Sequence, residues 1–188
     1  MKTRFIRHTF VLGGLCATAV LAGCGSMSHH KGSAYSQAGL PAEVQVPAGN
    51  RVAWETVGTG DITYECKAKN GAPGQAEWVF AGPKADLKDR QGKLVGKYYG
   101  PPATWEANDG SRLTATQVAV APAGAGNLPY QLVKANPVMG SGALTGVTYI
   151  QRVALKGGVA PAPSCASNMV GQRTTVPYQA DYIFWKAN

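Results

Sequence analysis

Apolar and polar residues alternate with a period of two along most of the chain after residue 42. In DITYECKAK (61–69) and VPYQADYIFW (176–185), every second side chain is apolar or aromatic. RLTATQVAVA (112–121) and GVTYIQRVAL (146–155) are long, rich in β-branched residues and without helix caps. Such patterns are typical of strands that place one face in a core. Shorter candidate strands cover 51–57, 76–81, 93–99 and 129–135.

Turn-forming sequences separate these candidate strands. They are NGAPG (70–74), DRQG (89–92), NDG (108–110) and PAGAGN (122–127). Asp109-Gly110 stands between two apolar runs, which is a strong signal for a β-hairpin. No segment has the apolar period of an amphipathic helix. The sequence therefore predicts an all-β fold of eight or more strands, an antiparallel β-sandwich or a barrel-like sheet, in a single domain over 42–188.

The first 23 residues have the layout of a secretory signal. MKTRFIRHT (1–9) carries three positive charges and no acid, and FVLGGLCATAVLA (10–22) is apolar or small. This apolar run is shorter than the roughly 20 residues that a membrane-spanning helix needs. A basic start, a short apolar centre and small residues form a signal peptide. We therefore expect 1–23 to be removed.

The signal ends in Leu21-Ala22-Gly23 followed by Cys24, which resembles the bacterial lipobox. We expect Cys24 to be lipidated and to anchor the mature chain to a membrane that the chain does not span. Gly25 after the cysteine resembles the pattern sorted to the outer membrane of a Gram-negative cell, on its periplasmic face. The alternative is an ordinary secretory signal followed by a coincidental cysteine.

Residues 24–41 are rich in Ser and Gly and show no apolar period, so they predict a flexible tether. His29 and His30 lie inside it, and two adjacent histidines alone do not complete a tetrahedral zinc site. The domain 42–188 contains no histidine. This excludes a Ser-His-Asp triad, a Cys-His pair and a His-ligated metal, so we expect no metal and no cofactor.

The composition favours a domain with a packed core and with charged residues spread along the sequence. Hydrophobic residues make up 45% of the chain and charged residues 15%, enough for a core. Lys2, Arg4 and Arg7 lie in the signal, so the formal net charge falls from +8 to +5 in a chain that starts at Cys24. No run of Lys and Arg marks a nucleic-acid patch, and we expect no nucleic-acid partner.

Cys66 and Cys165 are the only cysteines in the domain. Because exported proteins live where disulfides persist, we expect these two residues to form one. A reactive thiol is the alternative, but neither cysteine has a histidine or a clear basic partner beside it.

GPPATWEANDGSR (100–112) is the densest group of polar and aromatic residues. Trp105, Glu106 and Asp109 are therefore candidate ligand-binding residues, as a sugar platform or as a glycosidase carboxylate pair. The simpler interpretation, which we favour, is that Asn108-Asp109-Gly110 forms the turn and Trp105 packs in the core. We assign no catalytic residue.

Three classes of function stay open. The leading hypothesis is a lipid-anchored protein of the cell envelope with a non-enzymatic binding or structural role, whose partners are the membrane and an envelope glycan or protein. The alternatives are a carbohydrate-active hydrolase using Glu106 and Asp109, or Asp181, and a glycan- or lipid-binding module. An exposed strip of aromatic side chains would favour the glycan- or lipid-binding module.

From about Pro47 to Trp185 the sequence resembles a family of exported bacterial and fungal proteins catalogued as domain of unknown function 3455. The matching segments include VPAGNRVAWETVGTGDITYEC, WVFAGPKADLKDRQGKLVGKYY, PATWEANDGSR, GVTYIQRVALKGGVAP and VPYQADYIFW, together with Cys165. The resemblance implies a β-rich fold and export, and no reaction. The family usually has a histidine after the G-x-L-V-G segment, where Lys97, Tyr98 and Tyr99 stand here, so an activity that needs this histidine is not expected.

Overall fold

The computed structural model describes residues 35–188. The predicted signal, Cys24 and residues 24–34 of the predicted tether lie outside the described residues. Tyr35–Asn188 form one compact unit with its own core, which is the requirement for folding independently. Its elements are η1 (Ala42–Val44), β1 (Asn50–Ala68), β2 (Ala76–Lys88), β3 (Leu94–Tyr99), β4 (Thr104–Ala107), β5 (Arg112–Ala121), β6 (Tyr130–Ala135), β7 (Val147–Gly157), η2 (Ser167–Met169) and β8 (Arg173–Ala187).

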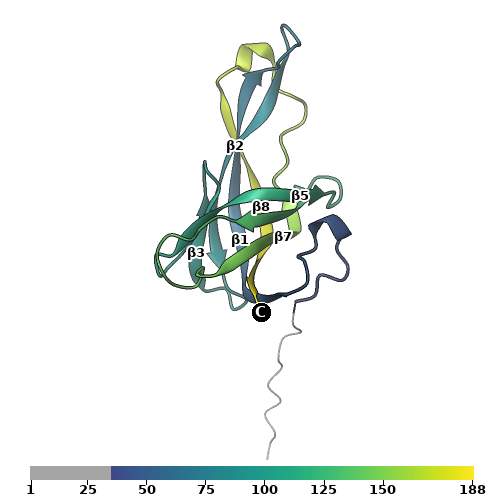
Figure 1. The fold of residues 1–188 in the computed structure, drawn as a ribbon. Helices are drawn as coiled ribbons and strands as arrows, with labels where there is room; N and C mark the ends of the chain where they lie inside the picture. The colour runs from purple at the N-terminus through teal and green to yellow at the C-terminus, as the bar shows by residue number, and fades with distance from the viewer. Residues whose placement is uncertain (1–34) are drawn as a thin grey trace, which may run out of the picture. The chain divides into compact units, whose positions relative to one another are not determined.

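The eight strands form a closed antiparallel barrel (Figure 1). Each strand pairs with the next, and β8 returns to pair with β1 from Asn50 opposite Ala187 to Glu65 opposite Arg173. Closure satisfies the backbone groups that an open sheet would leave unpaired at its edges. The all-β class is confirmed, and the barrel is the correct choice of the two predicted architectures.

The predicted strands 51–57 and 61–69 are one continuous strand, β1. Gly58 and Gly60 interrupt the apolar pattern between them. A Cβ added at Gly58 would lie 2.6 Å from Cε2 of Tyr182, so glycine allows β1 to approach this ring. The sequence does not predict β4 because its four residues are too few to show a period.

The hairpin predicted at Asp109-Gly110 is confirmed. It joins β4 to β5, which pair in antiparallel register. The Gly110 N–H donates to the Ala107 carbonyl over 3.0 Å. Gly110 has φ +85°, a left-handed conformation that glycine adopts without strain.

β1, β2 and β8 continue past the barrel into what we name the extension, residues 65–79 and 164–175 (top of Figure 1). Cys66 lies on β1 and Cys165 in the segment before η2. The two form a disulfide with an S–S distance of 2.06 Å, as predicted. Both cysteines are buried and pack with Ala76 in a small cluster separate from the barrel core.

The main core lies inside the barrel. Inward-facing side chains from most of the strands are almost fully buried there, including Ile62, Leu87, Leu113, Ile150 and Phe184. Aromatic rings add to this core, with the Trp54 and Phe184 ring centroids 4.9 Å apart. The alternation seen in the sequence therefore separates inward from outward side chains, as expected for a barrel.

A segment that we name the strap, residues 35–46, covers the outer face of β5 to β8. Val44 and Val46 are 1% and 4% exposed and pack with Leu132, Ile183 and Trp185 in a second cluster. Residues 35–41, which the sequence pattern assigns to the tether, thus contact the barrel.

Gln151 of β7 holds the strap in place and is 0% exposed. Its Nε2 donates to the Val44 carbonyl over 2.7 Å and to Oε1 of Gln37 over 3.0 Å. Its Oε1 accepts from Nε1 of Trp185 over 2.9 Å and from the Tyr35 hydroxyl over 3.2 Å. Burial is the main cause that raises the pKa of Tyr35 to about 12, so this hydroxyl keeps its proton at ordinary pH.

Candidate functional site

The structure does not bring Trp105, Glu106 and Asp109 together around one site. Trp105 and Glu106 are neighbours on β4, so their side chains leave opposite faces of the sheet. Trp105 is 3% exposed and packs in the barrel core, whereas Glu106 faces outward. Asp109 lies in the turn after β4.

Glu106 is held by two side chains of β3. Its Oε2 accepts a hydrogen bond from the Tyr99 hydroxyl over 2.6 Å, and its Oε1 lies 3.2 Å from Nζ of Lys97. The hydrogen bond from Tyr99, with that from Lys97, lowers the pKa of the Glu106 carboxyl. A carboxylate held in its charged form is a poor general acid.

Asp109 organises two turns. Its Oδ1 accepts from the backbone N–H and the hydroxyl of Ser111 over 2.9 and 2.6 Å. Its Oδ2 accepts from the Ala143 N–H over 2.7 Å, which ties the segment 140–146 to the β4–β5 hairpin. The Ser111 hydroxyl, followed by the Ala143 amide, lowers the pKa of Asp109.

Asp109→Asn is expected to change how stability depends on pH. Because the pKa of Asp109 is lower in the folded chain than its ordinary value of 3.8, the ionised carboxylate stabilises the fold above pH 3.8. That stabilisation is lost as the pH falls through the folded-state pKa. Urea unfolding should therefore show the wild type more stable than Asp109→Asn at pH 7, with the gap narrowing below pH 3.8. The exposed carboxylate variant Asp86→Asn is the control, and a gap that stays constant with pH would contradict this role.

Asp181, the third candidate carboxylate, forms an ion pair on the outer face of β8. Its Oδ2 lies 2.6 Å from Nη1 of Arg90, and Oε2 of Glu55 lies 2.8 Å from Nη2 of the same guanidinium. Burial lowers the pKa of Arg90, but the hydrogen bonds to Asp181 and Glu55 outweigh it and raise the pKa overall. Asp181 therefore has a structural partner.

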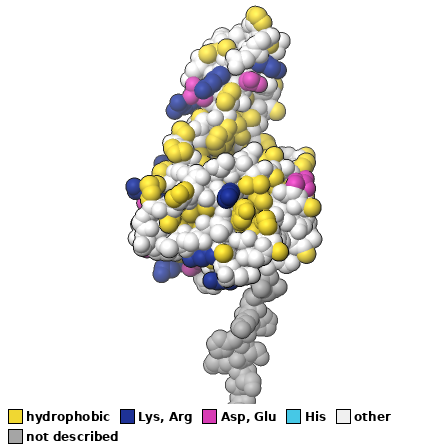
Figure 2. Space-filling view, viewed as in Figure 1, with side chains coloured by type: hydrophobic (Ala, Val, Ile, Leu, Met, Phe, Trp, Pro, Cys, Tyr) yellow, Lys and Arg dark blue, Asp and Glu magenta, His cyan; other side chains and the backbone are white. Residues whose placement is uncertain are grey.

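The barrel contains a cavity of about 370 Å³, which we name the barrel pocket. It is lined by residues of β1 to β7 and of the loops before β4 and β6. Figure 2 shows hydrophobic side chains gathered at the foot of the extension, the region to which lining residues Tyr64 and Phe80 belong. Phe80 is 49% exposed and Val120 is 44% exposed, so the pocket opens to solvent beside them.

Aromatic side chains form one wall of the barrel pocket. Tyr98 stacks on Trp105 with ring centroids 4.6 Å apart, and both residues line the pocket. Tyr182 is outside the lining and packs edge-on against Trp105 at 5.7 Å. Burial raises the pKa of Tyr98 and of Tyr182, so both hydroxyls stay neutral. Nε1 of Trp105 is buried and has no hydrogen-bond partner among residues 35–188. An unpartnered buried donor is unusual in a folded protein.

The polar side chains of the barrel pocket are few. Gln131 donates to Gln117 over 2.8 Å, and Arg152 of β7 is the only charged residue in the lining that the described residues provide. An apolar pocket with few polar groups is the usual form of a small-molecule site. Arg152 is not among the site residues predicted from the sequence. The available signal was its place in the apolar alternation of GVTYIQRVAL, where Ile150 also points inward.

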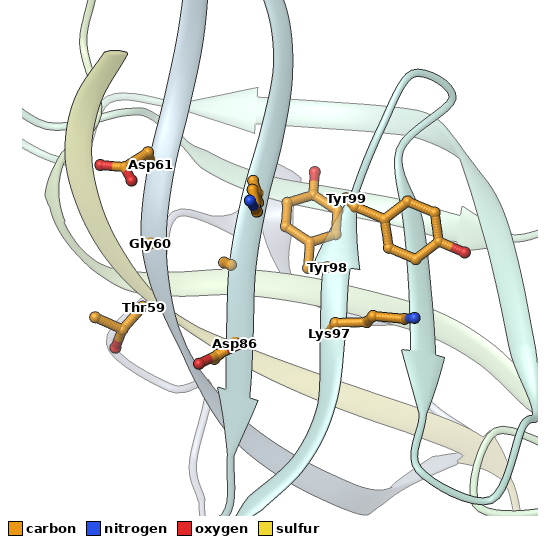
Figure 3. Close-up of a pocket in the computed structure, with 9 residues that line it drawn as sticks. Thr59, Gly60, Asp61, Asp86, Lys97, Tyr98 and Tyr99 are labelled. Atoms are coloured by element: carbon orange, nitrogen blue, oxygen red, sulfur yellow. The ribbon is translucent and has the colours of Figure 1, made fainter.

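A second depression, which we name the outer groove, has a volume of about 440 Å³ on the outside of β1, β2 and β3. In Figure 3, Thr59 and Asp61 lie on β1 at one side, whereas Lys97 and Tyr99 extend from β3 at the other. Lining side chains carry both signs of charge and face solvent, where water and salt screen them. The outer groove therefore defines no ligand class.

The tryptophans do not form an exposed strip. Trp105 and Trp185 are 3% and 7% exposed, and Trp54 and Trp78 are partly buried against the core. This arrangement counts against a flat aromatic platform for glycans within residues 35–188.

The described residues contain no group of three His, Cys, Asp or Glu side chains placed to hold a metal ion. None of the helices in residues 35–188 has the length and apolar character to cross a membrane.

Comparison with known proteins gives one match. The family described as "protein of unknown function (DUF3455)" matches residues 47–186. No curated protein and no solved structure matches the chain. The match covers all eight strands apart from the last residue of β8, and the chain therefore belongs to the DUF3455 family of proteins of unknown function.

Proposed function

We propose that this domain is a non-enzymatic binding module that takes a small apolar ligand into the barrel pocket. The observation that carries the proposal is the cavity of about 370 Å³, walled by Tyr98 and Trp105 and open beside Phe80 and Val120. Pockets of roughly 300–1,000 Å³ with apolar walls are the usual sites for small ligands. Barrels of about eight strands have interiors that suit a single small ligand.

The volume sets the size of the ligand. A water molecule takes roughly 30 Å³ in the liquid, so the barrel pocket corresponds to about a dozen non-hydrogen atoms. A short alkyl chain or one substituted ring has that size. An oligosaccharide is larger and more polar than this pocket accommodates.

The hydrolase alternative has less support than binding. Glu106 accepts a hydrogen bond from Tyr99, Asp109 accepts three within its turns, and Asp181 pairs with Arg90. Each carboxylate thus has a structural role that accounts for its position. None of the three is in the lining of the barrel pocket.

The binding function is tested with 1-octanol as the probe on residues 35–188. Calorimetry should give a dissociation constant of about 1 mM or tighter, which corresponds to roughly −4 kcal/mol. Ala115→Phe adds a ring to an inward-facing lining residue of β5 and should abolish binding. Its matched control is Thr116→Phe, the next residue on the opposite face of the strand, which should bind as the wild type does. Absence of octanol binding, or equal binding by both variants, would refute the proposal.

We further propose that the chain is a lipoprotein of the cell envelope, anchored through Cys24. The support is the signal-like segment 1–23 and the lipobox Leu21-Ala22-Gly23-Cys24. In a Gram-negative cell, Gly25 favours the periplasmic face of the outer membrane. The barrel would then hold its ligand close to a membrane surface.

Cys24→Ser in the full chain should move the protein from the membrane fraction to the soluble fraction of a bacterial lysate. The thiol is the acceptor of the lipid, and a serine hydroxyl does not replace it. Immunoblots of sedimented membranes measure this shift, and Cys16→Ser is the matched control that leaves the anchor in place. Equal sedimentation of Cys24→Ser and wild type would show that the anchor is not at Cys24.

A further inference from the structure

Arg152 places a positive charge inside the barrel. On β7, Ile150 faces the core and Gln151 faces the strap, so Arg152 returns to the inside. Its charge acts on the hydroxyls of Tyr64 and Tyr98. Burial raises the pKa of both tyrosines, and the positive charge of Arg152 opposes this rise.

The position of Arg152 is fixed by backbone features. Nε and Nη2 of its guanidinium both donate to the Pro129 carbonyl, over 3.3 and 3.0 Å. The register of β7 shifts between Val153 and Lys156, and Ala154 has φ +50°, a left-handed conformation that is uncommon for alanine. Bulges of this kind often lie beside functional sites and set the direction of a side chain.

No acidic side chain neutralises this charge. None of the ion pairs within residues 35–188 includes Arg152, and the lining of the barrel pocket contains no Asp or Glu from the described residues. Fully buried charges in proteins are normally paired, and Arg152 is half-buried without such a partner. A guanidinium has five N–H donors, more than the Pro129 carbonyl uses.

Trp105 lines the same pocket as Arg152. Its Nε1 has no hydrogen-bond partner among residues 35–188 but is closed off from solvent, so the spare N–H donors of Arg152 are the ones that a ligand in the pocket can reach. The remaining walls are mostly apolar. A ligand that matches this environment has an apolar body and accepts hydrogen bonds at one negatively charged end.

We propose that the barrel pocket binds small carboxylic acids with an apolar body, and that the Arg152 guanidinium binds their carboxylate. One guanidinium matches the single charge of a carboxylate and can bind its two oxygens together. A phosphate dianion would leave a negative charge unmatched in an apolar cavity. This inference rests on the proposed binding function and names its ligand class.

The test compares octanoate with 1-octanol, which differ only in the head group. Calorimetry on residues 35–188 at pH 7 should show that octanoate binds about tenfold or more tightly than 1-octanol, the usual worth of a hydrogen bond to a charged group. Arg152→Gln should remove this preference, so that the variant binds octanoate no more tightly than it binds 1-octanol. Arg152→Lys keeps the charge without the planar fork and should keep part of the preference. Thermal unfolding of each variant confirms that it is folded.

Each outcome decides the inference. Equal affinity of the wild type for octanoate and octanol would overturn it and leave the apolar binding function standing. Absence of binding by both probes would overturn the inference together with the proposed function. Tighter binding of octyl phosphate than of octanoate would show that the anion class is wrong. Because the comparison of head groups uses the wild type, a variant that does not fold does not affect the result.

Discussion

Cys66→Ala combined with Cys165→Ala is expected to lower the free energy of unfolding by about 4 kcal/mol. The disulfide joins residues 99 apart in sequence, and a loop of that length restricts the unfolded chain by up to about 4.7 kcal/mol in the chain-entropy model. Cys66 is 0% and Cys165 is 6% exposed. Alanine is the chosen replacement because it places no polar group at these buried positions. Scanning calorimetry should record a fall in the midpoint of roughly 10 °C.

Dithiothreitol provides the matched control for this prediction. Reduction should lower the midpoint of the wild type by a similar amount and leave the double variant unchanged. A double variant within about 1 kcal/mol of the wild type would mean that the extension contributes little to global stability. Hydrogen exchange would then show the extension, residues 65–79 and 164–175, opening without the barrel.

Gln151→Leu is expected to destabilise the fold by about 3 kcal/mol, because it removes all four hydrogen bonds of a buried amide. The Val44 carbonyl and Nε1 of Trp185 would lose their Gln151 partner inside the second cluster, and each unsatisfied buried group costs about 1–3 kcal/mol. Urea unfolding measures the loss. Hydrogen exchange should increase in the strap, including the Val46 amide that donates to Gln37 over 2.8 Å.

The control for Gln151 is Gln117→Leu. Gln117 is exposed and accepts one surface hydrogen bond from Gln131, so its replacement should change stability by no more than about 0.5 kcal/mol. Similar effects of the two variants would contradict the assignment of Gln151 as the residue that holds the strap.

The sequence predicts the features of the fold that depend on residues close together in the chain. The period of two identifies most strands, and Asp109-Gly110 identifies a hairpin, because both depend on residues within one or two strands. The disulfide was predictable because only two cysteines remain in the domain. The period of two also places the adjacent residues Trp105 and Glu106 on opposite faces of a strand, and this alone argues against a site that uses both side chains.

What the sequence does not predict depends on contacts between distant segments. Gln37 and Gln151 are separated by 114 residues and meet only when the strap lies on the barrel. Gly58 lies inside a strand because Tyr182, far along the chain, requires the space. The sequence does not mark Arg152 as a binding residue. Only the closed barrel shows that no carboxylate among residues 35–188 pairs with its guanidinium.

The pairing of β1 with β8 has a consequence for how the molecule forms. The first and last strands are sequence-distant partners along most of their length, and such non-local contacts form slowly because a long loop must close first. Until the ribosome has released Arg173–Ala187, β1 and β7 each lack one of their two neighbouring strands. The ring therefore assembles after synthesis of the last strand, and until then the chain stays open to any machinery that handles unfolded polypeptides.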